Sequence, residues 1–227
     1  MRPLLTASLL AALACGSTTG DGDPSRSGPG PAGPRPTSGF FPPDAVWYRD
    51  VSTAALDPQS AAVIAYLDRA GWGLGRMQID FSITVLEADT TTPLRAFTPT
   101  EDHFRPLPNA TIHAREYVHP ATHGTRATSG PPDAPPYGTR LRLRADYPLA
   151  TLPNEGARTV ARAMQRYGML LADAGRVALT ARSDRFARAR WDGLLGPLDL
   201  AAIRPGDFQM IAAGERIPVT NDCIRNP

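Results

Sequence analysis

Alternation of apolar and polar residues is clearest at residues 77–87. One face of this segment carries the apolar side chains of Met77, Ile79, Phe81, Ile83 and Val85, and the other face is polar. A period of two residues is typical of a strand with one buried face. Residues 139–145 alternate in the same way, with Leu141, Leu143 and Ala145 facing in and Arg140, Arg142 and Arg144 facing out. Both segments are therefore predicted to be half-buried strands.

Two other segments have the spacing of amphipathic helices. In residues 155–166 the apolar face consists of Ala157, Val160, Ala161 and Met164, while Arg158, Arg162 and Arg166 lie on the opposite side. Asn154 is a favourable N-cap for this helix. A second helix is predicted from Asp57, its cap, through Pro58 in the first turn to Gly71.

Shorter elements complete the predicted domain. We expect a strand near Tyr117, a hairpin of residues 167–172 and 176–180, a helix near 185–194 and a last strand near 207–213. Strands outnumber helices and their links are short. The prediction is an α+β fold, with a mainly antiparallel β-sheet and two or three helices, after a disordered N-terminal tether.

The N-terminus has the pattern of a secretory signal. An arginine precedes a short apolar run, and the small residues Ala12-Leu13-Ala14 precede Cys15. This arrangement predicts a signal peptide at residues 1–14 and a bacterial lipobox in which Cys15 becomes acylated. Residues 15–39 are rich in Gly, Ser, Thr and Pro, which predicts a disordered linker. Residues 40–227 are expected to form a single domain.

An acylated Cys15 would anchor the chain to a membrane and place it in the cell envelope, at the bacterial outer membrane or cell surface. The alternative is an ordinary secreted protein with a chance cysteine at the end of its signal. Acylation leaves Cys223 without a partner in the chain, which indicates an intermolecular bond, a buried thiol or a lost partner.

The composition narrows the classes of function. All 24 basic residues are arginine, and the formal net charge is only +2, so we expect no generic binding to nucleic acid. The sequence contains no phosphate-binding loop, dinucleotide fingerprint or nucleophile elbow, which argues against nucleotide chemistry.

The part of the chain after residue 40 contains a series of short motifs. They are Phe41-Pro42-Pro43-Asp44, Asp57-Pro58-x-Ser60, Tyr117–His123, Gly138–Ala145, Ala163–Met169, Ala172-Asp173, Ser183-Asp184 and Trp191. Together these motifs resemble an uncharacterised family of secreted or lipid-anchored bacterial proteins. Some of its members are attached to carbohydrate-binding or immunoglobulin-like modules, so the resemblance implies a role with glycans.

The resemblance also implies that a middle block is missing. Relatives carry further residues between the equivalents of Phe104 and Leu107, which are nearly adjacent here. The chain would then be a shortened paralogue, a degenerate copy or a truncated gene model. The block would also be a place for the lost partner of Cys223.

One cluster has residue types that ligate metals. It consists of His113, Glu116, His119 and His123. A zinc site needs three or four ligands held by surrounding groups, and Pro120 favours a loop here, so no metal or cofactor is expected. His119 is then either a general base or a strand-end residue bonded to backbone.

Two aspartates are candidates for acid–base catalysis. Asp173 and Asp184 could form the carboxylate pair that glycan hydrolysis requires. Each also has a structural interpretation, because Asp173 lies in a predicted turn and Asp184 at a predicted helix cap.

The row of Arg140, Arg142 and Arg144 predicts a surface for anions, because guanidinium binds carboxylate, sulfate or phosphate through paired hydrogen bonds. The alternative interpretation is that these arginines form a solvent-exposed face with no ligand. Tyr167 and Trp191 are candidate ligand-binding residues beside this row, and a tryptophan could stack on a sugar ring.

Two functional hypotheses follow. The first is a cell-envelope lipoprotein whose domain is a non-catalytic binding module for an anionic glycan or an envelope protein. The second is a glycan-acting enzyme, a hydrolase or lyase that could be degenerate, using His119, Asp173 or Asp184. An enzyme should bring His119, Tyr167 and Asp184 to one concave pocket, whereas a binding module would leave them scattered.

Overall fold

The computed structural model describes residues 41–72, 75–86, 88–96, 116–123, 130–172 and 179–219. The chain divides into two compact units, Met1–Arg49 and Asp50–Pro227. The predicted signal peptide, Cys15, the linker 15–39 and Cys223 lie outside the described residues. In the first unit the described part contains one 3-10 turn, η1 (Val46–Tyr48), and the ring of Trp47 lies 5.6 Å from that of Phe41.

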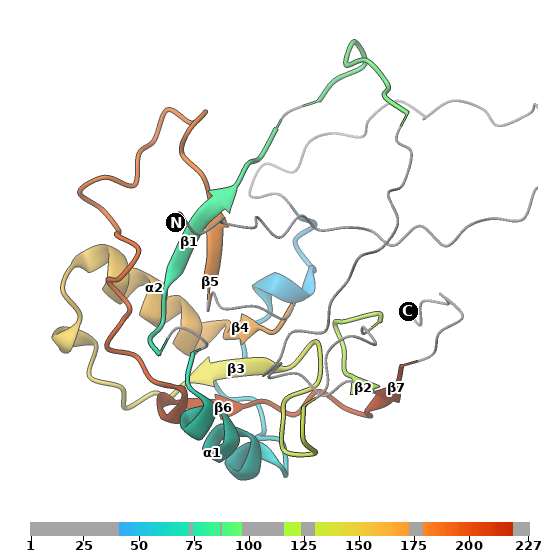
Figure 1. The fold of residues 1–227 in the computed structure, drawn as a ribbon, viewed down its shortest axis with the longest axis vertical. Helices are drawn as coiled ribbons and strands as arrows, with labels where there is room; N and C mark the ends of the chain where they lie inside the picture. The colour runs from blue at the N-terminus through green and yellow to red at the C-terminus, as the bar shows by residue number, and fades with distance from the viewer. Residues whose placement is uncertain are drawn as a thin grey trace, which may run out of the picture. The chain divides into compact units, whose positions relative to one another are not determined.

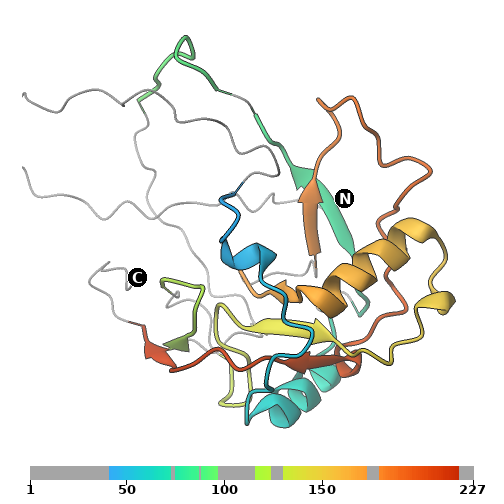
Figure 2. The same ribbon diagram turned by 180° about the vertical axis from the view of Figure 1, so that it is seen from behind.

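The second unit is built on a three-stranded antiparallel sheet. Its central strand is β3 (Arg140–Leu143), which pairs with β4 (Met169–Leu170) on one edge and β6 (Phe208–Met210) on the other. Helix α2 (Glu155–Arg166) lies above β3 and helix α1 (Ser60–Ala70) lies below it, in both Figure 1 and Figure 2. Helices on a largely antiparallel sheet confirm the predicted α+β class.

The core lies between these helices and the sheet. Its buried side chains come from α1 (Val63, Leu67), β1 (Ile79), β3 (Leu141, Leu143), α2 (Ala157, Ala161, Met164) and β6 (Phe208, Met210), with Met77, Leu200 and Ile203 from the connections. The apolar face predicted for residues 155–166 is therefore the buried face of α2. Asn154 caps this helix as predicted, because its Oδ1 accepts a hydrogen bond of 2.8 Å from the amide of Ala157.

Helix α1 begins two residues later than predicted. The cap position is Gln59, and the carboxylate of Asp57 instead accepts from the Gln59 amide at 2.8 Å. The helix ends at Gly71 as predicted, with φ at +73°, a conformation that favours glycine.

Two further pairs of strands lie outside the central sheet. Strand β1 (Ile79–Ile83) runs parallel to β5 (Leu179–Arg182), and β2 (Glu116–Tyr117) runs antiparallel to β7 (Ile217–Pro218). The predicted hairpin of 167–172 and 176–180 is wrong, because β4 pairs with β3 whereas β5 pairs with β1. Alternation of apolar and polar residues indicates a strand but does not show which strand it pairs with. The pairing depends on which strands the buried core brings together.

The predicted helix at 185–194 is also wrong. These residues form turns, whereas short 3-10 helices occur at η2 (Leu149–Thr151) and η3 (Pro205–Asp207). The cause lies at Asp184, whose carboxylate accepts from the Trp191 amide at 2.9 Å and whose carbonyl accepts from the Arg190 side chain at 2.8 Å. The two contacts tie Asp184 to the residues six and seven positions later, so this segment does not form the continuous backbone hydrogen bonds of a helix.

Candidate functional site

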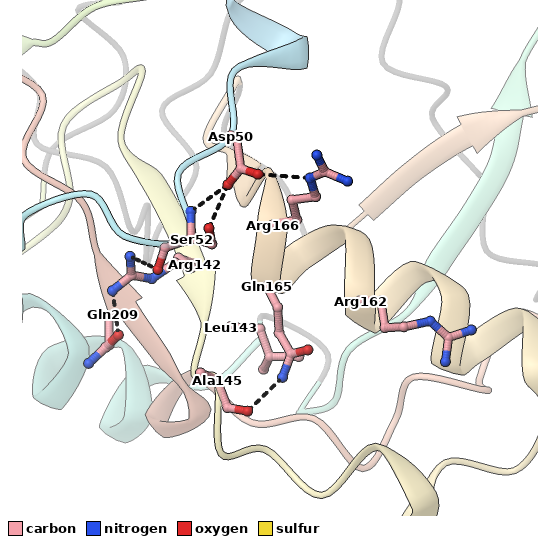
Figure 3. Close-up of a pocket in the computed structure, with 9 residues that line it drawn as sticks. All are labelled: Asp50, Ser52, Arg142, Leu143, Ala145, Arg162, Gln165, Arg166 and Gln209. Atoms are coloured by element: carbon pink, nitrogen blue, oxygen red, sulfur yellow. Dashed lines mark hydrogen bonds and ion pairs between the residues drawn. The ribbon is translucent and has the colours of Figure 1, made fainter.

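The second unit carries an open pocket of about 470 Å³ beside helix α2. Three segments form it: the chain just before α1, the end of β3, and the last two turns of α2, with one residue of β6. Its lining residues are Asp50, Ser52, Arg142, Leu143, Ala145, Arg162, Gln165, Arg166 and Gln209 (Figure 3). Seven of these nine side chains are polar, and three of them are arginine against one aspartate.

Asp50 organises one side of the pocket. Its Oδ1 accepts hydrogen bonds from the Ser52 hydroxyl at 2.6 Å and the Ser52 amide at 2.9 Å, and its Oδ2 accepts from Arg166 Nε at 2.8 Å. The two bonds from Ser52 lower the pKa of Asp50, and the charge and hydrogen bond of Arg166 add to this effect. Asp50 is therefore an anion at neutral pH.

Arg142 holds the opposite side. Its Nη1 donates to the carbonyl oxygens of Val51, Ser52 and Ala54 at 2.7, 2.8 and 3.1 Å, and its Nη2 donates to Gln209 Oε1 at 2.9 Å. Figure 3 shows its guanidinium turned toward the 51–54 segment. None of the described carboxylates pairs with Arg142, so its positive charge is balanced only by carbonyl and amide dipoles.

The face of α2 toward the pocket supplies the remaining polar groups. Arg166 Nε is bonded to Asp50, and no described group takes its two terminal nitrogens. Arg162 pairs with Glu155 and also bonds Thr159, so it extends along the helix in Figure 3. Gln165 donates to the carbonyls of Arg144 and Ala145 at 2.9 and 3.3 Å.

This arrangement can bind an anion that also carries hydroxyl groups. The two terminal nitrogens of Arg166 are hydrogen-bond donors, and 62% of this side chain is exposed to solvent. Gln165 Oε1 remains as an acceptor and Gln209 Nε2 as a donor, since their other amide atoms are used in the bonds above. Guanidinium suits carboxylate, sulfate or phosphate, and the amides suit hydroxyl groups.

The predicted arginine row is not an outward-facing row. Arg140 is 6% exposed, Arg142 is half-buried and bonded to backbone, and Arg144 is exposed and paired with Asp146 at 2.7 Å. The reason is that β3 is the central strand and its second face is covered as well. The stem of Arg140 packs beside Gly168, where an added Cβ would lie 2.9 Å from Arg140 Cγ.

The other candidate residues do not meet at the pocket. His119 is exposed after β2, and Asp173 and His113 lie outside the described residues. Tyr167, at which α2 ends, is not a lining residue, but its ring lies under the guanidinium of Arg166 at 5.2 Å. Asp184 and Trp191 do lie together, but as partners in the loop closure described above, and the Trp191 ring packs on Phe81 with centroids 5.1 Å apart. Among the described candidates, His119, Asp184, Tyr167 and Trp191 are not lining residues of the pocket.

Sequence reasoning missed several lining residues, namely Asp50, Ser52, Gln165, Arg166 and Gln209. The spacing of Arg162 and Arg166 on the polar side of a predicted helix was the available signal. It could not show that residues 50–52 lie against that side, because this contact joins segments over a hundred residues apart.

Metal ligands do not gather in the described ranges: no three His, Cys, Asp or Glu side chains lie close enough to hold an ion there. Nor does any described helix have the length and apolarity needed to cross a membrane. The chain matches no protein-family model, no curated protein and no solved structure.

Proposed function

We propose that the protein is a bacterial cell-envelope lipoprotein, anchored through acylated Cys15, whose domain is a non-catalytic binding module for an anionic glycan. The observation that carries the proposal is the pocket in which three arginines and one aspartate surround an open space beside α2. Its volume falls within the range of about 300–1,000 Å³ that is usual for small-ligand sites. The anchor and the location rest on the sequence around Cys15.

Arg166 is the central binding group of this proposal. Its Nε donates to Asp50 and its guanidinium lies over the Tyr167 ring at 5.2 Å, while its two terminal nitrogens have no hydrogen-bond partner among the described residues and remain available to a carboxylate or sulfate. Arg142 adds positive charge from a fixed position, since four hydrogen bonds hold it. A site that is rigid before binding loses little side-chain entropy when the ligand arrives.

An acidic sugar suits the pocket better than a neutral one. Neutral glycans are usually gripped by a stacked aromatic ring, and the nine lining residues include none. A uronic acid offers a carboxylate for Arg166, together with hydroxyl groups for Gln165 Oε1 and Gln209 Nε2. Recognition is then by charge and hydrogen bonds, which makes it sensitive to salt.

Binding without catalysis is favoured because the pocket lacks an evident acid–base pair. Asp50, the one carboxylate among the described lining residues, is held as an anion by Ser52 and Arg166, and such a group is a poor proton donor at neutral pH. His119 and Asp184, the candidates for proton transfer, are not lining residues.

The test is calorimetric titration of the full chain with an oligogalacturonate, beside a neutral oligosaccharide of the same length. We expect binding of the acidic sugar alone. Replacement Arg166→Gln should weaken it about tenfold or more, since a hydrogen bond to a charged group contributes about 1.5–3 kcal/mol. The matched control is Arg158→Gln on the same helix, because Arg158 bonds Glu155 and the Leu152 carbonyl outside the pocket. Equal weakening by both variants, or no binding by a folded wild-type protein, would contradict the proposal.

A further inference from the structure

The loop that follows β5 is rich in arginine and carries an exposed phenylalanine. Arg182, Arg185, Arg188 and Arg190 fall within nine residues, and Phe186 lies among them. In Figures 1 and 2 this loop extends away from β5 on the side of the unit opposite to α1. It is separate from the pocket described above, to which it contributes no lining residue.

Three arginines of this loop, Arg185, Arg188 and Arg190, form no ion pair with a carboxylate in the described ranges. The carboxylate of Asp184 is bonded to the Trp191 amide. Phe186 is 69% exposed, and the Arg185 guanidinium lies over its ring at 5.2 Å. The loop thus presents an apolar ring within a group of cations.

The loop is held in one conformation by its own hydrogen bonds. Trp191 Nε1 donates to the Arg182 carbonyl at 2.7 Å, and the Ala187 amide donates to the Asp184 carbonyl at 2.9 Å. Together with the contacts of Asp184 to Arg190 and Trp191, these bonds fix both ends of the loop. Phe186 is therefore exposed on a segment whose backbone is tied by hydrogen bonds at both ends.

Strand β1 brings further apolar side chains to the same edge. Because β1 and β5 are parallel, both strands end together, and the Ser183 amide donates to the Ile83 carbonyl at 2.7 Å. Ile83 is 42% exposed, and Leu86, three residues beyond it, is 77% exposed. This edge of the β1–β5 pair thus combines exposed apolar side chains with arginines.

We propose that the loop 182–190 is a docking surface for an anionic lipid membrane. Arg185, Arg188 and Arg190 would bind the phosphate groups of anionic lipids, while Phe186 enters the boundary between headgroups and acyl chains. An exposed apolar ring with one cation over it and two more arginines within four residues suits a membrane surface, which is negatively charged outside and apolar a few ångströms deeper. A soluble polyanion would engage the arginines but leave Phe186 in water, which distinguishes the two kinds of partner.

The test is sedimentation of the full chain with vesicles of equimolar phosphatidylglycerol and phosphatidylcholine, beside vesicles of phosphatidylcholine alone. Every sample carries Cys15→Ser, so that no acyl chain contributes to binding. We expect binding to the anionic vesicles, weakened about fivefold for each arginine lost in Arg185→Gln/Arg188→Gln. Phe186→Ser should weaken it about tenfold, since burial of most of a phenylalanine ring is lost.

Matched controls use the same changes away from the loop. Arg69→Gln/Arg204→Gln removes two other exposed arginines, and Leu198→Ser removes an apolar side chain on a different turn, so both should leave vesicle binding unchanged. In Phe186→Trp the added fluorescence should shift to the blue only with anionic vesicles. Failure of the wild-type protein to bind would overturn the proposal, as would equal weakening by the control pair. Loop-dependent binding to heparin with no blue shift on vesicles would overturn it in favour of a soluble polyanion.

Discussion

Arg142 provides the most direct check on the physical reasoning, because the sequence presents it as one of three equivalent arginines. The structure gives the three side chains different surroundings, and Arg142 alone bonds three backbone carbonyls of the 51–54 segment. We consider Arg142→Met, which keeps the length and apolar stem of the side chain and removes its charge and donors.

The expected loss can be worked out from those bonds. Nη1 has two hydrogens for three carbonyls, and the bond to the Ser52 carbonyl is exposed, so water can replace it. Three part-buried contacts remain, to the carbonyls of Val51 and Ala54 and to Gln209 Oε1. At the typical net contribution of about 1 kcal/mol for a hydrogen bond, Arg142→Met should cost about 3 kcal/mol of unfolding free energy.

Urea denaturation measures this loss. With a slope of about 2 kcal/mol per molar, 3 kcal/mol lowers the midpoint by about 1.5 M. The control is Arg144→Met, two residues along the same strand, whose ion pair with Asp146 is exposed and contributes at most about 1 kcal/mol. If the two variants lowered the midpoint equally, the assignment of Arg142 as the residue that holds segment 51–54 would be refuted.

Two other predictions concern α2 and Asp50. Replacement of glycine by alanine ordinarily stabilises a helix. Gly156→Ala should instead destabilise the fold by about 1–3 kcal/mol in the same assay, because the new Cβ would overlap the Leu194 carbonyl oxygen. An increase in stability would contradict this packing. For Asp50 the folded pKa lies below its ordinary value of 3.8, so its contribution is present above pH 3.8 and is lost as the pH falls through the lower folded value. Wild type and Asp50→Asn should therefore differ in urea midpoint near neutral pH and converge below about pH 3.8; a difference that grew on acidification would count against this linkage.

Patterns within a single segment of the sequence predicted the helices and strands whose signals lie within that segment. The span, cap and buried face of α2 follow from Asn154 and a period of 3.6 residues, and both are visible within one segment. For β1 and β3 the prediction was correct in part: both strands are shorter than predicted, and Ile79, Leu141 and Leu143 are buried as expected. Ile83 and Ala145, which were predicted to face in, are exposed, and Arg140, which was predicted to face out, is buried.

Long-range pairing was not predictable in this way. Leu179 pairs with Ile79 and not with the nearby β4, because the partner of a strand depends on which edges the whole core leaves open. The same limit applies to the pocket. Alternation placed Arg140 and Arg142 outside, but it could not show that Gly168 and residues 51–54 would cover them.

The parallel pairing of β1 with β5 bears on how this protein can change length during evolution. Every described ladder of the central sheet and of the β1–β5 pair joins residues that precede Ala96 to residues that follow Glu116, or joins residues within the later part. A block gained or lost between those two positions leaves these registers untouched. Doubling the length of a flexible connection costs only about 0.6 kcal/mol of closure entropy. Insertion or deletion between Ala96 and Glu116 therefore leaves the described ladders in place, so chains of different length could share this core.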